Sequence, residues 1–90
     1  MILTTTNSIE NHPIIDYLGI VTTTNSFTIS IFSNRQQTIE QKKEEAFKKL
    51  AKNALNLKAN AIVGIKLQVS GMANTILLIT ITGTAVKVKV

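Results

Sequence analysis

The sequence predicts an α+β domain in which one long helix packs on an antiparallel sheet. Apolar residues recur at steps of three, four and seven between residues 37 and 57, which is the spacing of one buried helical stripe. Apolar and polar residues alternate over residues 63–70 and again over residues 79–82, which is typical of strands with one buried face. Because 90 residues are few for more than one core, residues 1–90 are expected to form a single domain.

Two strands are expected before the helix. Residues 14–21 are apolar on both alternating faces, which suits a strand covered on each side, and a neighbouring subunit is one candidate for the second cover. Residues 22–26 form a polar cluster of Thr, Asn and Ser. After this cluster Phe27, Ile29 and Ile31 alternate with polar residues, which predicts a second strand with one apolar face.

The helix has recognisable end signals. Ser33 and Asn34 each precede a glutamine by three positions, so either residue can open a capping box. Asn60 follows the last turn and is expected to adopt the left-handed conformation that ends many helices. The stripe that should face the sheet consists of Ile39, Ala46, Phe47, Leu50, Ala54 and Leu57.

The C-terminal strands form a predicted hairpin with residues 71–74 as the connection. Around Gly83 the apolar positions change from odd (Leu77, Ile79 and Ile81) to even (Val86, Val88 and Val90). A period-two pattern changes parity at a bulge or a break, and glycine accepts the backbone of a bulge, so a bulge is predicted at Gly83 and Thr84. Residues 85–90 should then face a different surface, with Lys87 and Lys89 opposite the valines, and form an arm suited to strand addition.

The composition indicates a chain that gains stability from association. The chain has no Cys, which excludes disulfides, and its apolar residues are mainly aliphatic, with 44% hydrophobic and 4% aromatic residues. Small domains without disulfides commonly need a metal or a partner subunit. No apolar run approaches the roughly 20 residues that cross a bilayer, and the N-terminus lacks a signal-peptide pattern, so we expect a cytoplasmic protein without membrane contact.

Few residues are candidates for chemistry. His12, with Glu10 and Asp16 nearby, is the one conceivable metal cluster, but zinc sites normally use three or four nitrogen or sulfur ligands, so no metal site is expected. No acid, base and nucleophile set is identifiable, and the glycine spacing matches no phosphate loop, so we expect neither catalytic residues nor a cofactor. The net charge of +5 permits contact with nucleic acid, although glutamates dilute the basic helix.

Four segments of the chain match the pattern of a known family. They are Thr4-Thr5-Thr6, Tyr17-Leu18-Gly19-Ile20-Val21, Ala59-Asn60-Ala61-Ile62-Val63-Gly64 and Gly83-Thr84-Ala85-Val86. With these segments the chain resembles the YbjQ-like proteins, a largely uncharacterised family that often carries a heavy-metal-binding label. The resemblance implies a dodecin-like subunit, with a helix on an antiparallel sheet, and a ring of subunits that is a pentamer. No metal ligand is carried over, because the chain has no Cys and one His.

The chain departs from the family pattern at two places. The glycine-rich stretch before the helix is shortened to Ser33-Asn34-Arg35, and Lys58 stands where the pattern has a helix-ending glycine. No ligand of the connecting loop is therefore carried over to this chain from the resemblance.

The leading functional hypothesis is a non-enzymatic, ring-forming binding or structural protein that has copies of itself as partners. The second hypothesis is a small-ligand or metal binder that uses pockets between subunits, where symmetry repeats His12 or Tyr17. A basic nucleic-acid-binding module is third, and an enzyme is last. The structural or interface candidates are Tyr17, Gly19, Asn60, Gly64, Gly83 and Thr84.

Overall fold

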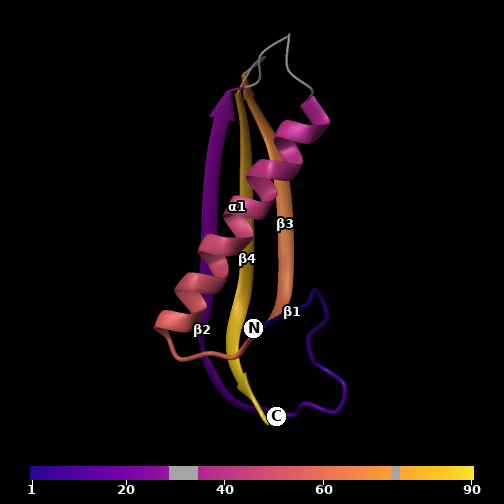
Figure 1. The fold of residues 1–90 in the computed structure, drawn as a ribbon, viewed down its shortest axis with the longest axis vertical. Helices are drawn as coiled ribbons and strands as arrows, with labels where there is room; N and C mark the ends of the chain where they lie inside the picture. The colour runs from indigo at the N-terminus through magenta and orange to yellow at the C-terminus, as the bar shows by residue number, and fades with distance from the viewer. Residues whose placement is uncertain (29–34, 74–75) are drawn as a thin grey trace.

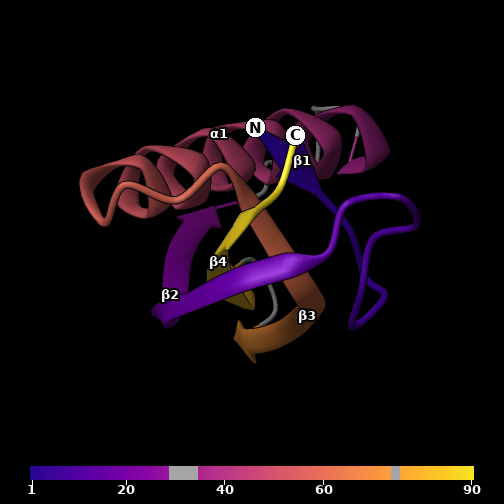
Figure 2. The same cartoon turned by 90° about the horizontal axis from the view of Figure 1, so that it is seen from below.

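A computed structural model of the protein describes residues 1–28, 35–73 and 76–90, and these residues form a helix layer on a sheet layer (Figure 1 and Figure 2). The elements are β1 (Ile2–Leu3), β2 (Ile14–Thr28), α1 (Arg35–Asn56), β3 (Ala61–Ala73) and β4 (Ile76–Val88). The strand order is β1-β3-β4-β2, with β2 and β3 antiparallel to β4. The predicted α+β class, with one helix packed on one sheet, is confirmed.

The sheet is mixed rather than antiparallel, because β1 runs parallel to β3. The backbone N–H of Ile2 donates to the carbonyl of Asn60 at 3.1 Å, and that of Thr4 donates to the carbonyl of Ile62 at 3.0 Å. Two residues are too few to show a strand period, so this element had no sequence signal of its own.

The strand β2 continues through the polar cluster that was expected to interrupt it. Residues 22–26 lie within β2, where Val21, Thr23 and Phe27 are buried and their neighbours are exposed. Threonine is β-branched and suits a pleated strand, so this polar run continues the strand: Thr22 and Thr24 occupy exposed positions and Thr23 a buried one. The rest of the predicted second strand, residues 29–31, lies outside the described residues.

The helix α1 buries the predicted stripe against β2 and β4. Ala46, Leu50 and Ala54 are fully buried, and Ile39 and Phe47 pack at the margin of the same cluster. Leu57 follows the last helical residue and is exposed. The predicted capping residues 33 and 34 lie outside the described part of the chain. No helix in that part combines the length and hydropathy of a membrane span.

Lys58, rather than the predicted Asn60, ends the helix in the left-handed conformation, with φ of 66°. The N–H of Lys58 donates to the carbonyl of Leu55 at 2.9 Å, and the N–H of Ala59 donates to that of Ala54 at 3.1 Å. These two bonds form a Schellman motif with Lys58 at the position that glycine usually occupies. The departure from the family pattern at Lys58 therefore lies at a strained backbone position.

The bulge predicted at Gly83 and Thr84 is wrong for β4 itself. The register shifts lie in its partners: in β3 between Val63 and Lys66, opposite Gly83, and in β2 on either side of Tyr17. Along β4 the side chains continue to alternate between the two faces of the sheet. Near the end of the strand, the face opposite α1 is covered by apolar side chains as well. Gly83 therefore lies opposite a bulge in β3 and is not itself part of a bulge.

Two apolar clusters cover the two faces of the sheet. The first lies under α1 and includes Ala85, and the second lies on the other face. The second cluster consists of Ala61, Val63, Val86 and Val88, packed by Ile2, Ile9 and Ile14. Val86 and Val88 therefore face a different surface from the helix side, as predicted for residues 85–90, whereas Ala85 still faces α1. The arm free for strand addition is a wrong prediction, because β4 lies between β2 and β3, and residues 85 and 86 pair with both neighbours.

Candidate functional site

The structure brings four of the six candidate residues into one band across the sheet. Gly83 and Thr84 lie in the central strand β4, and Gly19 pairs with the next residue of β4 from the β2 side. Gly64 lies in the β3 bulge on the opposite side of the same band. The three glycines therefore occupy neighbouring strands, although they are far apart in the sequence.

Gly83 allows β3 and β4 to pack closely. A Cβ atom at this position would lie 2.6 Å from Ile62 Cγ2 and 3.1 Å from Ile65 Cγ1, and both isoleucines are buried under α1. Real Cβ atoms do not approach other atoms this closely, so any side chain here displaces the core. Gly83 is a packing residue.

Gly64 orients the N-terminal segment. Its φ of 61° is a left-handed conformation, and its N–H donates to the carbonyl of Thr6 at 2.7 Å. A Cβ atom here would lie 3.3 Å from Asn7 Oδ1. Gly64 therefore permits both the bulge and the close approach of residues 6 and 7 to β3.

Asn60 joins the ends of β3 and β4 through its side chain. Its Nδ2 donates to the carbonyl of Val88 at 2.9 Å, and its Oδ1 accepts from the N–H of Val88 at 2.8 Å. The backbone N–H of Asn60 also donates to the carbonyl of Val86 at 3.2 Å. The side-chain amide extends the ladder as a further residue would, which gives Asn60 a structural role.

Tyr17 lies on the outer strand β2 among apolar side chains that face solvent. Ile15, Tyr17 and Ile20 are 62%, 69% and 76% exposed, and we call them the β2 edge patch. On the opposite edge of the sheet Leu67 and Val69 are 39% and 41% exposed, and we call them the β3 edge patch. The two patches leave apolar area in water on both sides of one subunit.

His12 takes part in a structural contact. Its Nδ1 lies 3.0 Å from the carbonyl oxygen of Lys89, and the N–H of Lys89 donates to the carbonyl of Pro13 at 2.9 Å. Glu10 and Asp16 do not join it, since the described residues contain no group of three or more His, Cys, Asp or Glu side chains able to hold a metal ion. His12 ties the C-terminal residues to the N-terminal segment.

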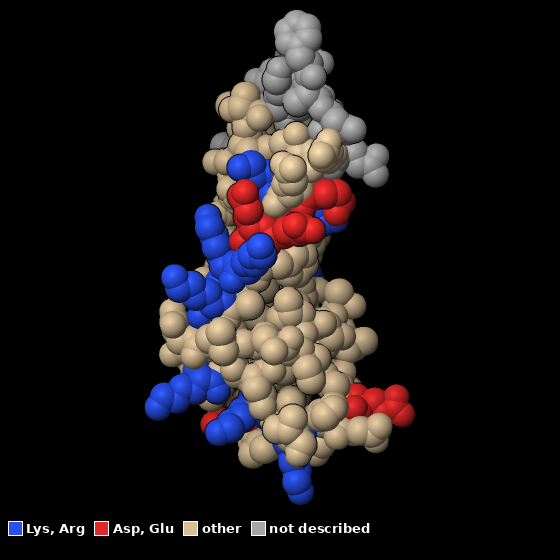
Figure 3. All heavy atoms as spheres, viewed as in Figure 1, with Lys and Arg blue, Asp and Glu red and all other residues tan. Residues whose placement is uncertain are grey.

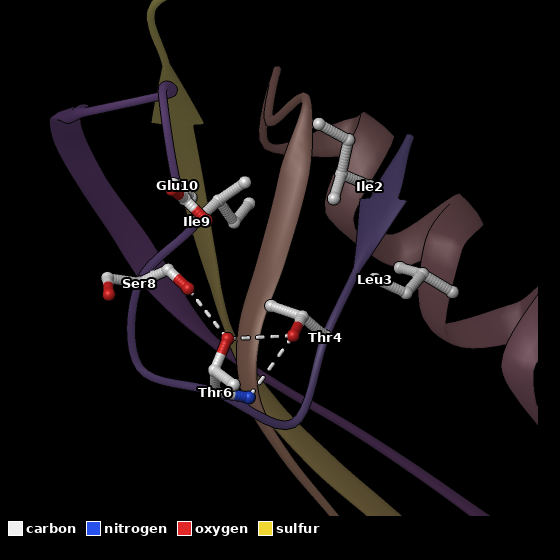
Figure 4. A pocket seen from close by; sticks show the side chains of 7 residues that line it. All are labelled: Ile2, Leu3, Thr4, Thr6, Ser8, Ile9 and Glu10. Atoms are coloured by element: carbon white, nitrogen blue, oxygen red, sulfur yellow. Dashed lines mark hydrogen bonds between the residues drawn. The ribbon is translucent and has the colours of Figure 1, made fainter.

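A cavity of about 700 Å³ opens between β1 and residues 8–10 (Figure 4). Its lining residues are Ile2, Leu3, Thr4, Thr6, Ser8, Ile9 and Glu10. The Oγ1 of Thr6 donates to the carbonyl of Ser8 at 2.6 Å and lies 2.8 Å from Thr4 Oγ1, which in turn accepts from the N–H of Thr6 at 3.2 Å. The sequence reasoning missed this cavity; the run of threonines at residues 4–6 was its only signal.

Acidic and basic side chains are mixed along α1. Figure 3 shows Lys and Glu side chains next to one another over the helix, beside a wide uncharged area. Lys42 pairs with Glu45 at 3.5 Å, and Lys43 pairs with Glu40 at 3.2 Å. The face that carries α1 is therefore not uniformly basic.

Comparisons with known proteins agree with this architecture. The model of a family described as "Putative heavy-metal-binding" matches residues 32–89. A UPF0145 protein of Anoxybacillus flavithermus is 36% identical over 99% of both chains, and one of Pseudomonas putida GB-1 is 32% identical over 99% of this chain and all of its own. A crystal structure of a DUF74-family protein of unknown function from Pediococcus pentosaceus has the same fold, with a TM-score of 0.81, 23% identity, and coverage of 99% of this chain and 98% of its own. The chain thus belongs to the YbjQ-like family, which contains the uncharacterised UPF0145 proteins.

Proposed function

We propose that the protein acts in the cytoplasm as a non-enzymatic homo-oligomer, a ring of dodecin-like subunits that join edge to edge. The observation that carries this proposal is the exposure of apolar side chains at opposite edges of one sheet. The outer side of β2 has no strand partner, and β3 has none on its outer side beyond residue 65, within the described part of the chain. Such edges readily pair with another chain.

The position of the two patches favours a ring over a simple dimer. An isologous dimer uses the same surface on both copies, and its formation would leave one of the two patches exposed. If the β2 edge patch of one subunit covers the β3 edge patch of the next, every copy buries both. A head-to-tail contact of this kind closes into a ring when a whole number of equal rotations from one subunit to the next completes a full turn. The family resemblance suggests five subunits.

Complementary variants test this arrangement. Ile20→Lys blocks the β2 edge patch and leaves the β3 edge patch intact, whereas Val69→Lys does the reverse. Each variant alone should be a monomer, and an equimolar mixture should form a dimer with one copy of each, because one intact pair of patches remains. Gln41→Lys adds the same charge on an exposed turn of α1 and should leave the assembly unchanged. If the mixture stays monomeric, or if either variant alone assembles as the unchanged protein does, the edge-to-edge ring is wrong.

A small-ligand binder is the second candidate, and the cavity beside β1 favours it. The metal named in the family description fits the donor set poorly: the chain has no Cys, and its one His directs Nδ1 to the Lys89 carbonyl. Soft metals prefer thiolate and imidazole ligands, which a single subunit does not gather among its described residues. Native mass spectrometry with and without a chelator tests a site shared between copies, and an unchanged mass with each added metal would exclude it.

A further inference from the structure

The cavity beside β1 lies within one subunit, so an inference about its ligand goes beyond the proposed assembly and does not depend on it. Its volume of about 700 Å³ is within the range of small-molecule sites. Ile2 and Ile9, which line it, also pack against the second apolar cluster. A ligand would therefore meet apolar side chains as well as the oxygen atoms beside them.

Counting hydroxyl protons shows which hydrogen bonds the cavity can still make. Each threonine hydroxyl has one proton and two lone pairs. The Thr6 hydroxyl gives its proton to the Ser8 carbonyl, so in the bond between the two threonines Thr4 must be the donor. Both protons are then engaged, and each hydroxyl retains one free lone pair. Thr4 and Thr6 therefore offer acceptors and no donors.

The same residues are held rigidly. The N–H and carbonyl of Thr4 bond to Ile62 and Ile65 of β3 at 3.0 Å and 3.1 Å, and the carbonyl of Thr6 accepts from Gly64 at 2.7 Å. Because both backbones are fixed to the sheet, the acceptors keep their places without a ligand, which lowers the entropic cost of binding. Figure 4 shows the two hydroxyls side by side, joined by the dashed line of their hydrogen bond.

Glu10 lines the same cavity and contributes a negative charge to it. A carboxylate accepts hydrogen bonds and attracts cations, and the Ser8 hydroxyl can turn to donate or accept. We propose that the cavity binds an aliphatic primary ammonium compound, with its N–H groups directed to Thr4 and Thr6, its charge attracted by Glu10 and its carbon chain along Ile2 and Ile9. A neutral alcohol or an anion of the same length matches this lining less well.

Titration of the full chain with hexylammonium, followed by NMR, tests the proposal. We expect saturable shifts confined to the amides of residues 4–10 and the methyl groups of Ile2 and Ile9. Hexanol has the same chain without the charge, and hexyltrimethylammonium has the charge without N–H donors, so both should bind at least about tenfold more weakly. Equal affinity for hexanol, or shifts that lie elsewhere or do not occur, would overturn the proposal.

Substitutions with matched controls separate the two kinds of contact. Glu10→Gln should weaken hexylammonium binding about tenfold, whereas Glu44→Gln on α1 removes the same charge and should not. Thr4→Val keeps the shape and removes the acceptor, and it should also weaken binding. Thr5→Val is the control, because Thr5 is exposed and does not line the cavity. An unchanged affinity in Glu10→Gln contradicts the assignment. Failure of the ring leaves this result unaffected, because all of these residues come from one subunit.

Discussion

Replacing Gly83 with alanine tests the close contact of β3 and β4. The new Cβ would lie 2.6 Å from Ile62 Cγ2, and it would also approach the Val63 carbonyl oxygen to 3.4 Å. Real Cβ atoms essentially never show a contact of 2.6 Å, whereas 3.4 Å is an ordinary contact, so it is the Ile62 side chain that has to move. Inserting one methyl group into a packed core costs about 1–3 kcal/mol, and the severity of this overlap places Gly83→Ala near the upper value. A domain of this size loses about 4–8 °C of melting temperature per kcal/mol.

Urea unfolding at a fixed protein concentration measures this cost. The concentration must be held constant, since association contributes to the stability of an oligomer. Gly71→Ala is the matched control: a Cβ there meets nothing within 4 Å, and its φ lies outside the left-handed range. Removing a glycine from an open strand position stabilises by about 0.5–1 kcal/mol, so the two variants should shift the urea midpoint in opposite directions.

A double-mutant cycle then identifies the atoms responsible. Ile62→Ala removes the Cγ2 atom that the new methyl group would overlap, so Gly83→Ala should cost at least about 1 kcal/mol less in that background. If Gly83→Ala is as harmless as Gly71→Ala, or if the two effects are additive, the packing explanation of Gly83 is wrong.

Three further substitutions have expected effects on the free energy of unfolding. Lys58→Gly should stabilise the protein by about 0.5 kcal/mol because φ is 66°, whereas Lys58→Ala should not, and equal urea midpoints for the two would contradict this reading. Asn60→Ala should cost about 1–3 kcal/mol by removing both side-chain bonds to Val88, and a stability equal to that of the unchanged chain would show that the amide contributes nothing. Thr23→Val should stabilise by up to about 1 kcal/mol, because the buried Thr23 hydroxyl has no hydrogen-bond partner among the described residues; a loss of stability in thermal melts would refute this.

The sequence predicted the elements in which the hydrophobic pattern repeats several times. The helical stripe around Leu50 reappears as a buried face, whereas the alternation over residues 63–70 is buried only as far as Ile65, because the side chains of Leu67 and Val69 are exposed. The strand β2 was divided in error because its middle is polar, although Thr22 and Thr24 simply occupy the exposed positions of one strand. The polar run was taken as a break between strands, although β-branched threonine suits a strand at exposed positions and, at Thr23, at a buried one.

The candidate site was harder to predict, because it depends on which strands become neighbours. The change of phase near Gly83 was real, but its cause lies in the N-terminal residues that cover one face near the end of β4. The bulge lies in β3 beside Gly64, and no local pattern in β4 distinguishes that case from a bulge of its own. The acceptor set of Thr4 and Thr6 likewise arises only when β1 pairs with β3. Long-range pairing of this kind has no periodic signal.

The molar mass of the unmodified chain in solution tests the central claim most directly. Light scattering on protein eluting from a sizing column, at micromolar concentration, should give a multiple of the 9.8 kDa subunit mass, and five copies if the family resemblance holds for the ring. A single species of 9.8 kDa across that concentration range would contradict the account, because the exposed β2 and β3 edge patches would then need no second copy to cover them.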